Sequence, residues 1–202
     1  MMPGLQHQPL VLASASAARR DLMAGVGLSV ELQPVSLDEE ALRRSRPDLS
    51  PARMAVFLAE AKALAVSRLR PGILVLGGDQ ILEHAGAALG KANSMAEVAA
   101  RLKDFRGRTH HLHSGAALAQ DGAVVWHGVD TASLTVRNFS DDWLEAYLTA
   151  EGSTLSGVVG GYRLEGPGAQ LFEQIKGDYF TVLGLPLWAV LDALRDRGVI
   201  GR

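Results

Sequence analysis

Short apolar runs alternate with helical stretches along the first half of this 202-residue chain, and this alternation constrains the fold most. The run Leu10–Ala13 has the length and composition of a buried strand, and residues 17–25 have helical composition and end at a glycine. Residues 108–119 and 123–136 alternate around Gln-Asp-Gly, which predicts a hairpin. We therefore expect an α/β fold in which helices flank one mixed, twisted sheet.

Further segments carry signals of regular structure. They are strands at 28–32 and at 73–82 (interrupted by Gly77–Gln80), helices at Pro51 (N-cap Ser50), 94–105 and 140–150, a glycine-rich loop at 157–168 and a closing helix at 185–197. No repeat or linker divides them. We therefore predict one domain over residues 1–202.

Composition narrows the classes of function. The chain has no cysteine, which excludes a disulfide framework, an iron–sulfur cluster and a thiol nucleophile. Its net charge of −2 is spread along the sequence, unlike the basic face of a nucleic-acid-binding protein. It has no apolar run of transmembrane length, and its first residues lack the positive region of a signal peptide. We expect a cytoplasmic protein whose partners are neither nucleic acid nor membrane.

The turn after the first apolar run is a candidate anion site. Ser14, Ser16 and Arg19 lie where a strand passes into a helix, and the free N–H groups of a helix start favour phosphate. The alternative is an ordinary N-cap followed by solvated arginines.

The segment Gly77-Gly78-Asp79-Gln80 holds the strongest indication of a site. An acid inside an apolar strand needs a partner, and tandem glycines permit close approach of a ligand. A second acidic group, Asp38–Glu40, suits a divalent cation, although a helix dipole favours acids at the same place.

Three other patterns are less specific. Lys62 lies at the border of the apolar face of its helix, where a lysine reaches either into a cleft or into solvent. Gly86–Lys91 lacks the spacing and the Ser/Thr of a P-loop, but Lys91 after a glycine can still meet a phosphate. His111 and His113 share one strand face at zinc-ligand spacing, without a third ligand nearby in sequence.

Taken in order, several blocks resemble the Maf proteins, which are nucleoside triphosphate pyrophosphatases. These blocks are LVLASASAARRDLM, SLDEE, LAEAKA, GGDQIL, LGKA, FRGRTHHLHSG and LEGPGAQLFEQIKGDYFTVLGLPL, and they span nearly the whole chain. The resemblance implies a Maf/HAM1-like fold with two lobes around a deep cleft, a homodimer and a link to septum formation. It also implies hydrolysis of a nucleotide to its monophosphate and pyrophosphate with Mg²⁺ or Mn²⁺.

The resemblance assigns roles to matching residues. It implies that Asp79 accepts a proton, that Arg19, Lys62 and Lys91 act on the phosphates, and that Glu39 and Asp79 hold the metal. These roles agree with the chemistry of phosphoryl transfer, because cations must accept the charge that builds up at phosphorus.

Three positions bear on the base. Gln80 with Glu165 is similar to the branch that acts on 7-methyl-GTP, whereas Ala18 stands where that branch has a tryptophan. A broad or dTTP/UTP-preferring pyrophosphatase therefore stays open. A HAM1-like inosine triphosphatase and a non-catalytic, nucleotide-binding regulator of cell division are further alternatives.

Overall fold

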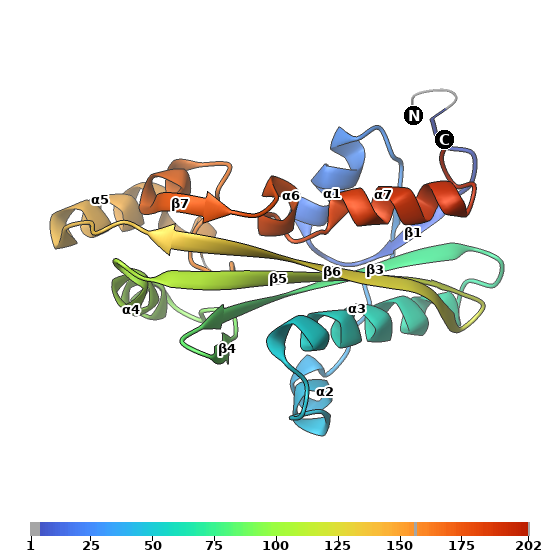
Figure 1. The fold of residues 1–202 in the computed structure, drawn as a ribbon, viewed down its shortest axis with the longest axis horizontal. Coiled ribbons are helices and arrows are strands. Elements are labelled where there is room, and N and C mark those ends of the chain that lie inside the picture. The colour runs from blue at the N-terminus through green and yellow to red at the C-terminus, as the bar shows by residue number, and fades with distance from the viewer. Residues whose placement is uncertain (1–4, 156, 202) are drawn as a thin grey trace. The chain divides into compact units, whose positions relative to one another are not determined.

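The computed structural model describes residues 5–155 and 157–201, which form a mixed sheet with flanking helices (Figure 1). The sheet order is β2-β1-β3-β5-β6-β7, and β4 pairs with β3. The strands are β1 (Leu10–Ala13), β2 (Glu31–Leu32), β3 (Leu74–His84), β4 (Ala87–Leu89), β5 (Thr109–Gln120), β6 (Ala123–Val136) and β7 (Phe172–Lys176). β1 is parallel to β2 and β3, while β4 and β7 are antiparallel to β3 and β6. The predicted α/β class with a mixed sheet is confirmed.

Four of the helices have a serine as N-cap. The helices are α1 (Ala17–Gly25), α2 (Glu39–Ser45), α3 (Pro51–Ser67), α4 (Met95–Phe105), α5 (Asp141–Glu151), α6 (Tyr179–Val182) and α7 (Leu187–Asp196), with 3-10 turns η1 (Gly152–Leu155) and η2 (Pro167–Leu171). Ser16, Ser50, Ser94 and Ser140 each accept the backbone N–H three residues further on, as N-caps do. Over the described residues, no helix is long and apolar enough to cross a membrane.

Two predicted strands differ from the structure. The predicted interruption at residues 77–80 is wrong, because β3 runs unbroken through Gly77–Gln80. At Gly77, the backbone of α3 leaves no room for a Cβ, and at Gly78 a Cβ would lie 3.0 Å from the Arg19 side chain, so these glycines serve close packing within the strand rather than a turn. The strand predicted at 28–32 is shorter, since the Leu28 N–H instead bonds the Met23 carbonyl and caps α1.

The described chain forms two compact units. The first comprises residues 5–80, 113–130 and 178–201, and the second comprises 81–112, 131–155 and 157–177.

In the first unit, the β3 segment has a different helix layer on each face (Figure 1). Leu74 and Leu76 pack in a core cluster with buried side chains of α1 and α7. Val75, between them in sequence, packs in a second cluster with Val66 of α3. This alternation follows from the two-residue period of a strand. The odd-numbered residues of this β3 segment therefore face α3, and the even-numbered residues face α1 and α7.

Helix α3 lies in direct main-chain contact with β3 and β5. A Cβ built on Gly115 of β5 would lie 2.6 Å from the Val56 backbone nitrogen, and one on Gly77 would lie 2.8 Å from the Ala63 nitrogen. Small side chains complete this layer, because Ala59 and Ala63 pack on buried alanines of β5. The close approach therefore depends on glycine at both strand positions.

The second unit has a buried histidine beside aromatic rings. The His110 ring stacks on Phe105 at 4.5 Å between centroids, and its Nε2 shares a hydrogen bond of 2.5 Å with the Tyr162 hydroxyl. Burial lowers the pKa of His110 from its ordinary value to about 3, and the charges of His84 and His111 act in the same direction. His110 is therefore neutral in the folded protein at neutral pH.

We expect Gly115→Ala to destabilise the protein by about 3 kcal/mol, because the added methyl would collide with the backbone of α3. Denaturant unfolding measures the change. Gly25→Ala is the matched control, since a Cβ there meets no atom within 4 Å. Equal unfolding midpoints for the two variants would contradict a main-chain contact between α3 and β5.

We expect His110 to make the protein less stable below pH 6.5. The unfolded chain binds a proton on this histidine between pH 6.5 and about 3 while the native state does not, so the free energy of unfolding falls as pH falls. The loss between pH 7.5 and pH 5 is about 2 kcal/mol. In the double variant His110→Phe/Tyr162→Phe, the free energy of unfolding should fall by about 2 kcal/mol less over this pH range than in the wild-type protein. The variant His7→Gln, which changes an exposed histidine, should show the wild-type pH dependence. Equal pH dependence in all three proteins would show that native His110 takes up the proton.

Candidate active site

Strand β3 directs its polar residues to opposite faces. Gly77 and Asp79 follow Val75 on the α3 face, whereas Gly78 and Gln80 follow Leu76 on the face of α1 and α7. A Cβ on Gly78 would indeed lie 3.0 Å from the Arg19 side chain, on the far side from α3. The tandem glycines thus let a helix and an arginine approach the two faces immediately before Asp79.

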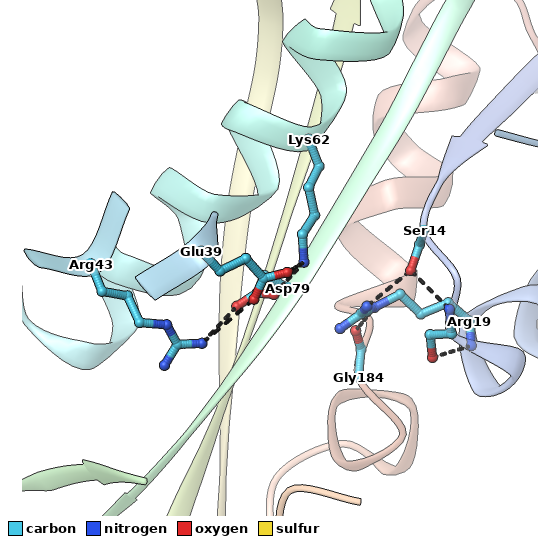
Figure 2. Close-up of polar contacts among 8 residues, drawn as sticks. Ser14, Arg19, Glu39, Arg43, Lys62, Asp79 and Gly184 are labelled. Atoms are coloured by element: carbon cyan, nitrogen blue, oxygen red, sulfur yellow. Dashed lines mark hydrogen bonds and ion pairs between the residues drawn. The ribbon is translucent and has the colours of Figure 1, made fainter. Parts of the chain in front are cut away.

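On the α3 face, Lys62 joins two carboxylates (Figure 2). Its Nζ lies 2.6 Å from Asp79 Oδ1 and 2.8 Å from Glu39 Oε1. Asp79 is only 6% exposed, so its charge needs this partner. Lys62, for which the sequence left two interpretations open, therefore reaches inward rather than into solvent.

Helix α2 supplies Glu39 and an arginine that the sequence analysis did not select. Asp38 is the N-cap of α2 and accepts the Ala41 N–H at 2.8 Å, which places Glu39 in the first turn. Arg43, one turn later, has its Nη2 3.9 Å from both Glu39 Oε2 and Asp79 Oδ2. The i, i+4 spacing of Glu39 and Arg43 is the sequence signal that could have found it.

The two carboxylates offer oxygen ligands for a divalent ion. Asp79 Oδ2 is buried and accepts no hydrogen bond from any residue that the structure describes. Mg²⁺ commonly takes one or two protein carboxylates and completes its shell with phosphates and water, so Glu39 and Asp79 fit such an ion. Among residues 5–155 and 157–201, no group of three His, Asp or Glu side chains could hold a metal ion. His111 and His113 of β5, which have zinc-ligand spacing in the sequence, therefore have no third such ligand among these residues.

On the other face, Arg19 is held inside the protein. Its Nε donates to the Gly184 carbonyl at 2.7 Å, and its Nη1 donates to Ser14 Oγ at 3.1 Å (Figure 2). Ser16 caps α1 by accepting the Arg19 N–H. Burial lowers the pKa of Arg19 from its ordinary value, while the charges of Asp79 and Glu39 oppose that shift. A guanidinium so placed stays a cation at neutral pH and is directed by its neighbours.

Gln80 lies on the same face as Arg19. Its amide nitrogen donates to the Thr181 and Val182 carbonyls at 3.0 and 3.1 Å and to Ser114 Oγ at 3.0 Å. The separation of about a hundred residues between Gln80 and α6 hid these partners from sequence reasoning.

The structure thus places eight of the predicted site residues in the first unit, six of them around β3. They are Ser14, Arg19, Glu39, Lys62, Asp79 and Gln80, with Ser16 and half-buried Ala18 on the adjoining turn and helix. Lys91 and Glu165 belong to the second unit, where both are exposed, Lys91 after β4 and Glu165 in the turn before η2.

The fold defines an α/β protein whose polar cluster is built around one buried strand. The family model of the Maf-like proteins matches residues 9–197. This chain belongs to that family.

Bacterial relatives align with the chain over almost its full length. Proteins named "Nucleoside triphosphate pyrophosphatase" from Granulibacter bethesdensis and Caulobacter vibrioides are 46% and 45% identical to it. These alignments cover 93% and 95% of this chain and 96% and 97% of the relatives. A HAM1 protein from Coxiella burnetii aligns with 64% of this chain and 73% of its own, at a TM-score of 0.43 and 19% identity, a likeness too slight to carry an argument.

Proposed function

We propose that this chain, as one domain over residues 1–202, hydrolyses nucleoside triphosphates to the monophosphate and pyrophosphate. Membership of the Maf-like family and the shared name of its relatives support this activity. The observation that carries it is the cluster of buried Asp79, Lys62 and the partly exposed Glu39, whose two acids act electrostatically on Arg19, so that acids for a metal are combined with cations for phosphate.

In this proposal Glu39 and Asp79 hold Mg²⁺ or Mn²⁺, which when bound withdraws charge from the phosphates. The buried Asp79 Oδ2, which accepts no hydrogen bond from the described residues, supports this assignment. Lys62 donates to both acids, so it holds their oxygens in place and limits their repulsion.

The chain's own residues bind the substrate and move the proton. Arg19 donates from its buried position to the phosphates, and Lys91 provides a second cation for them. Arg43 is a third cation beside Asp79. Asp79 orients the attacking water and accepts its proton as the water oxygen bonds to the α-phosphorus, and the bond from that phosphorus to the leaving pyrophosphate breaks.

For the base, the proposal is a preference for 7-methyl-GTP over GTP. N7-methylation makes guanine cationic, and the exposed Glu165 carboxylate attracts such a ring where a neutral glutamine does not. Ala18 offers no aromatic surface, so the preference is modest and ordinary triphosphates are also hydrolysed. A homodimer and a cytoplasmic role linked to septum formation stay predictions of the family resemblance.

The activity is tested on a panel of canonical and modified nucleoside triphosphates with Mg²⁺. We expect pyrophosphate release that EDTA abolishes, and we expect Asp79→Asn to lower kcat by at least ~10²-fold, because the variant loses the charge that holds metal and accepts the proton. Asp79→Asn should also weaken Mn²⁺ binding, measured by electron paramagnetic resonance. The control is Asp192→Asn, an exposed acid of α7.

Near-normal turnover of folded Asp79→Asn, or full activity in EDTA, would overturn the mechanism. Nucleotide binding without any pyrophosphate release would favour the non-catalytic regulator. Turnover confined to inosine triphosphate would favour a HAM1-like enzyme.

We expect Glu165→Gln to reduce the ratio of kcat/KM for 7-methyl-GTP to that for GTP, because it removes the charge opposite the methylated ring. Ala18→Trp should raise the ratio, since a cation–π contact adds about 0.5–2 kcal/mol. Glu173→Gln, an exposed acid on β7 of the same unit, should leave it unchanged. Much faster hydrolysis of dTTP or UTP by the wild-type protein would refute the base preference but not the pyrophosphatase activity.

A further inference from the structure

The turn between α6 and α7 carries the carbonyl that directs Arg19. Gly184 accepts the Arg19 Nε–H at 2.7 Å, and the φ of Gly184 is +104°, in the region that favours glycine. A Cβ at Gly184 would also lie 3.4 Å from Arg19 Nη2. The guanidinium direction therefore depends on where this turn lies.

Side-chain donors from the sheet hold the same turn. Helix α6 has four residues, so the carbonyls at its end have few partners within the helix. Gln80 of β3 donates to the Thr181 and Val182 carbonyls, and Ser114 of β5 donates to Thr181 at 2.7 Å. Ser114 Oγ also accepts from Gln80, so the two side chains act as one unit.

A third strand anchors α6 from the side. The Thr181 hydroxyl donates to Asp130 Oδ2 at 2.8 Å, and both Thr181 and Ser114 are fully buried. Removing the Gln80 amide would leave the Val182 carbonyl without its side-chain donor, whereas the Thr181 carbonyl would keep Ser114 and the Gly184 N–H.

We infer that Gln80, together with Ser114, is a positioning residue for Arg19: it ties the α6–α7 turn to the sheet and so aims the guanidinium at the phosphates. This inference rests on the proposed function. It differs from the assignment of Gln80 to the base pocket, because a residue that acts through Arg19 affects every nucleotide alike. In that case the adjacent residues Asp79 and Gln80 serve one reaction from opposite faces of β3.

The test is a double-mutant cycle between Gln80→Met and Arg19→Lys, read as kcat/KM for purine and pyrimidine triphosphates. Methionine keeps the shape of glutamine but donates no hydrogen bond. We expect Gln80→Met to lower kcat/KM about tenfold for all nucleotides, and less than threefold in the Arg19→Lys protein, because the residue it positions is already changed. Ser114→Ala should behave in the same way and provides a second variant if Gln80→Met does not fold.

Gln120→Met is the matched control. Its amide donates to the Gly72 carbonyl at 3.3 Å at the end of β5, so we expect unchanged kinetics. A change in the ratio between bases for Gln80→Met would assign Gln80 to base recognition and overturn the inference. Equal losses in the two Arg19 backgrounds, or no loss, would also overturn it.

Binding of inorganic tripolyphosphate, measured by calorimetry, separates this inference from the proposed function. Gln80→Met should weaken that binding in the wild-type background and not in Arg19→Lys, whether or not the protein hydrolyses nucleotides. If no nucleotide is hydrolysed but this coupling is found, the pyrophosphatase proposal fails and the positioning role stands. If hydrolysis is found without coupling, the positioning role fails.

Discussion

The main-chain contact of α3 with the sheet is the constraint on which the candidate site depends. With no side chain at Gly77, the Ala63 backbone comes close to the strand, and Lys62 is carried to the level of Asp79. A longer distance between helix and strand would leave the lysine short of a buried acid. An unpaired carboxylate there would cost several kcal/mol, so packing and charge pairing at this point support each other.

The two-residue period of β3 then distributes the chemistry. Neighbouring positions on a strand project to opposite faces, so Asp79 and Gln80 reach different layers without any turn between them. One layer supplies Glu39, Lys62 and Arg43, and the other supplies Arg19 and the α6–α7 turn. Both groups of side chains contact consecutive residues of β3. Their positions along the strand are therefore related through the backbone of β3.

Local signals explain which parts of this arrangement the sequence predicts. Serine caps, the hairpin turn and the acid within an apolar strand are encoded by residues a few positions apart, and those predictions agree with the structure. The break predicted at Gly77–Gln80 was wrong. In a local sequence window tandem glycines indicate a turn, whereas in the structure Gly77 is needed for the close contact with the backbone of α3. Arg43 has a local signal in its i, i+4 spacing from Glu39, but its contact with Asp79 and the Gln80 contacts with α6 depend on neighbours that only tertiary folding brings together.

The charge at the site also could not be read from composition. The whole chain has a net charge of −2, which argues against a nucleic-acid-binding face but does not reveal a local site for a small polyanion. Around β3, however, the cations Arg19, Arg43 and Lys62 exceed the two acids by one, as 3 − 2 = +1. Charges this close act almost independently of the distant surface, because solvent and salt screen the rest of the chain. A slightly acidic protein can therefore present a locally cationic site in which the acids stay available for a metal.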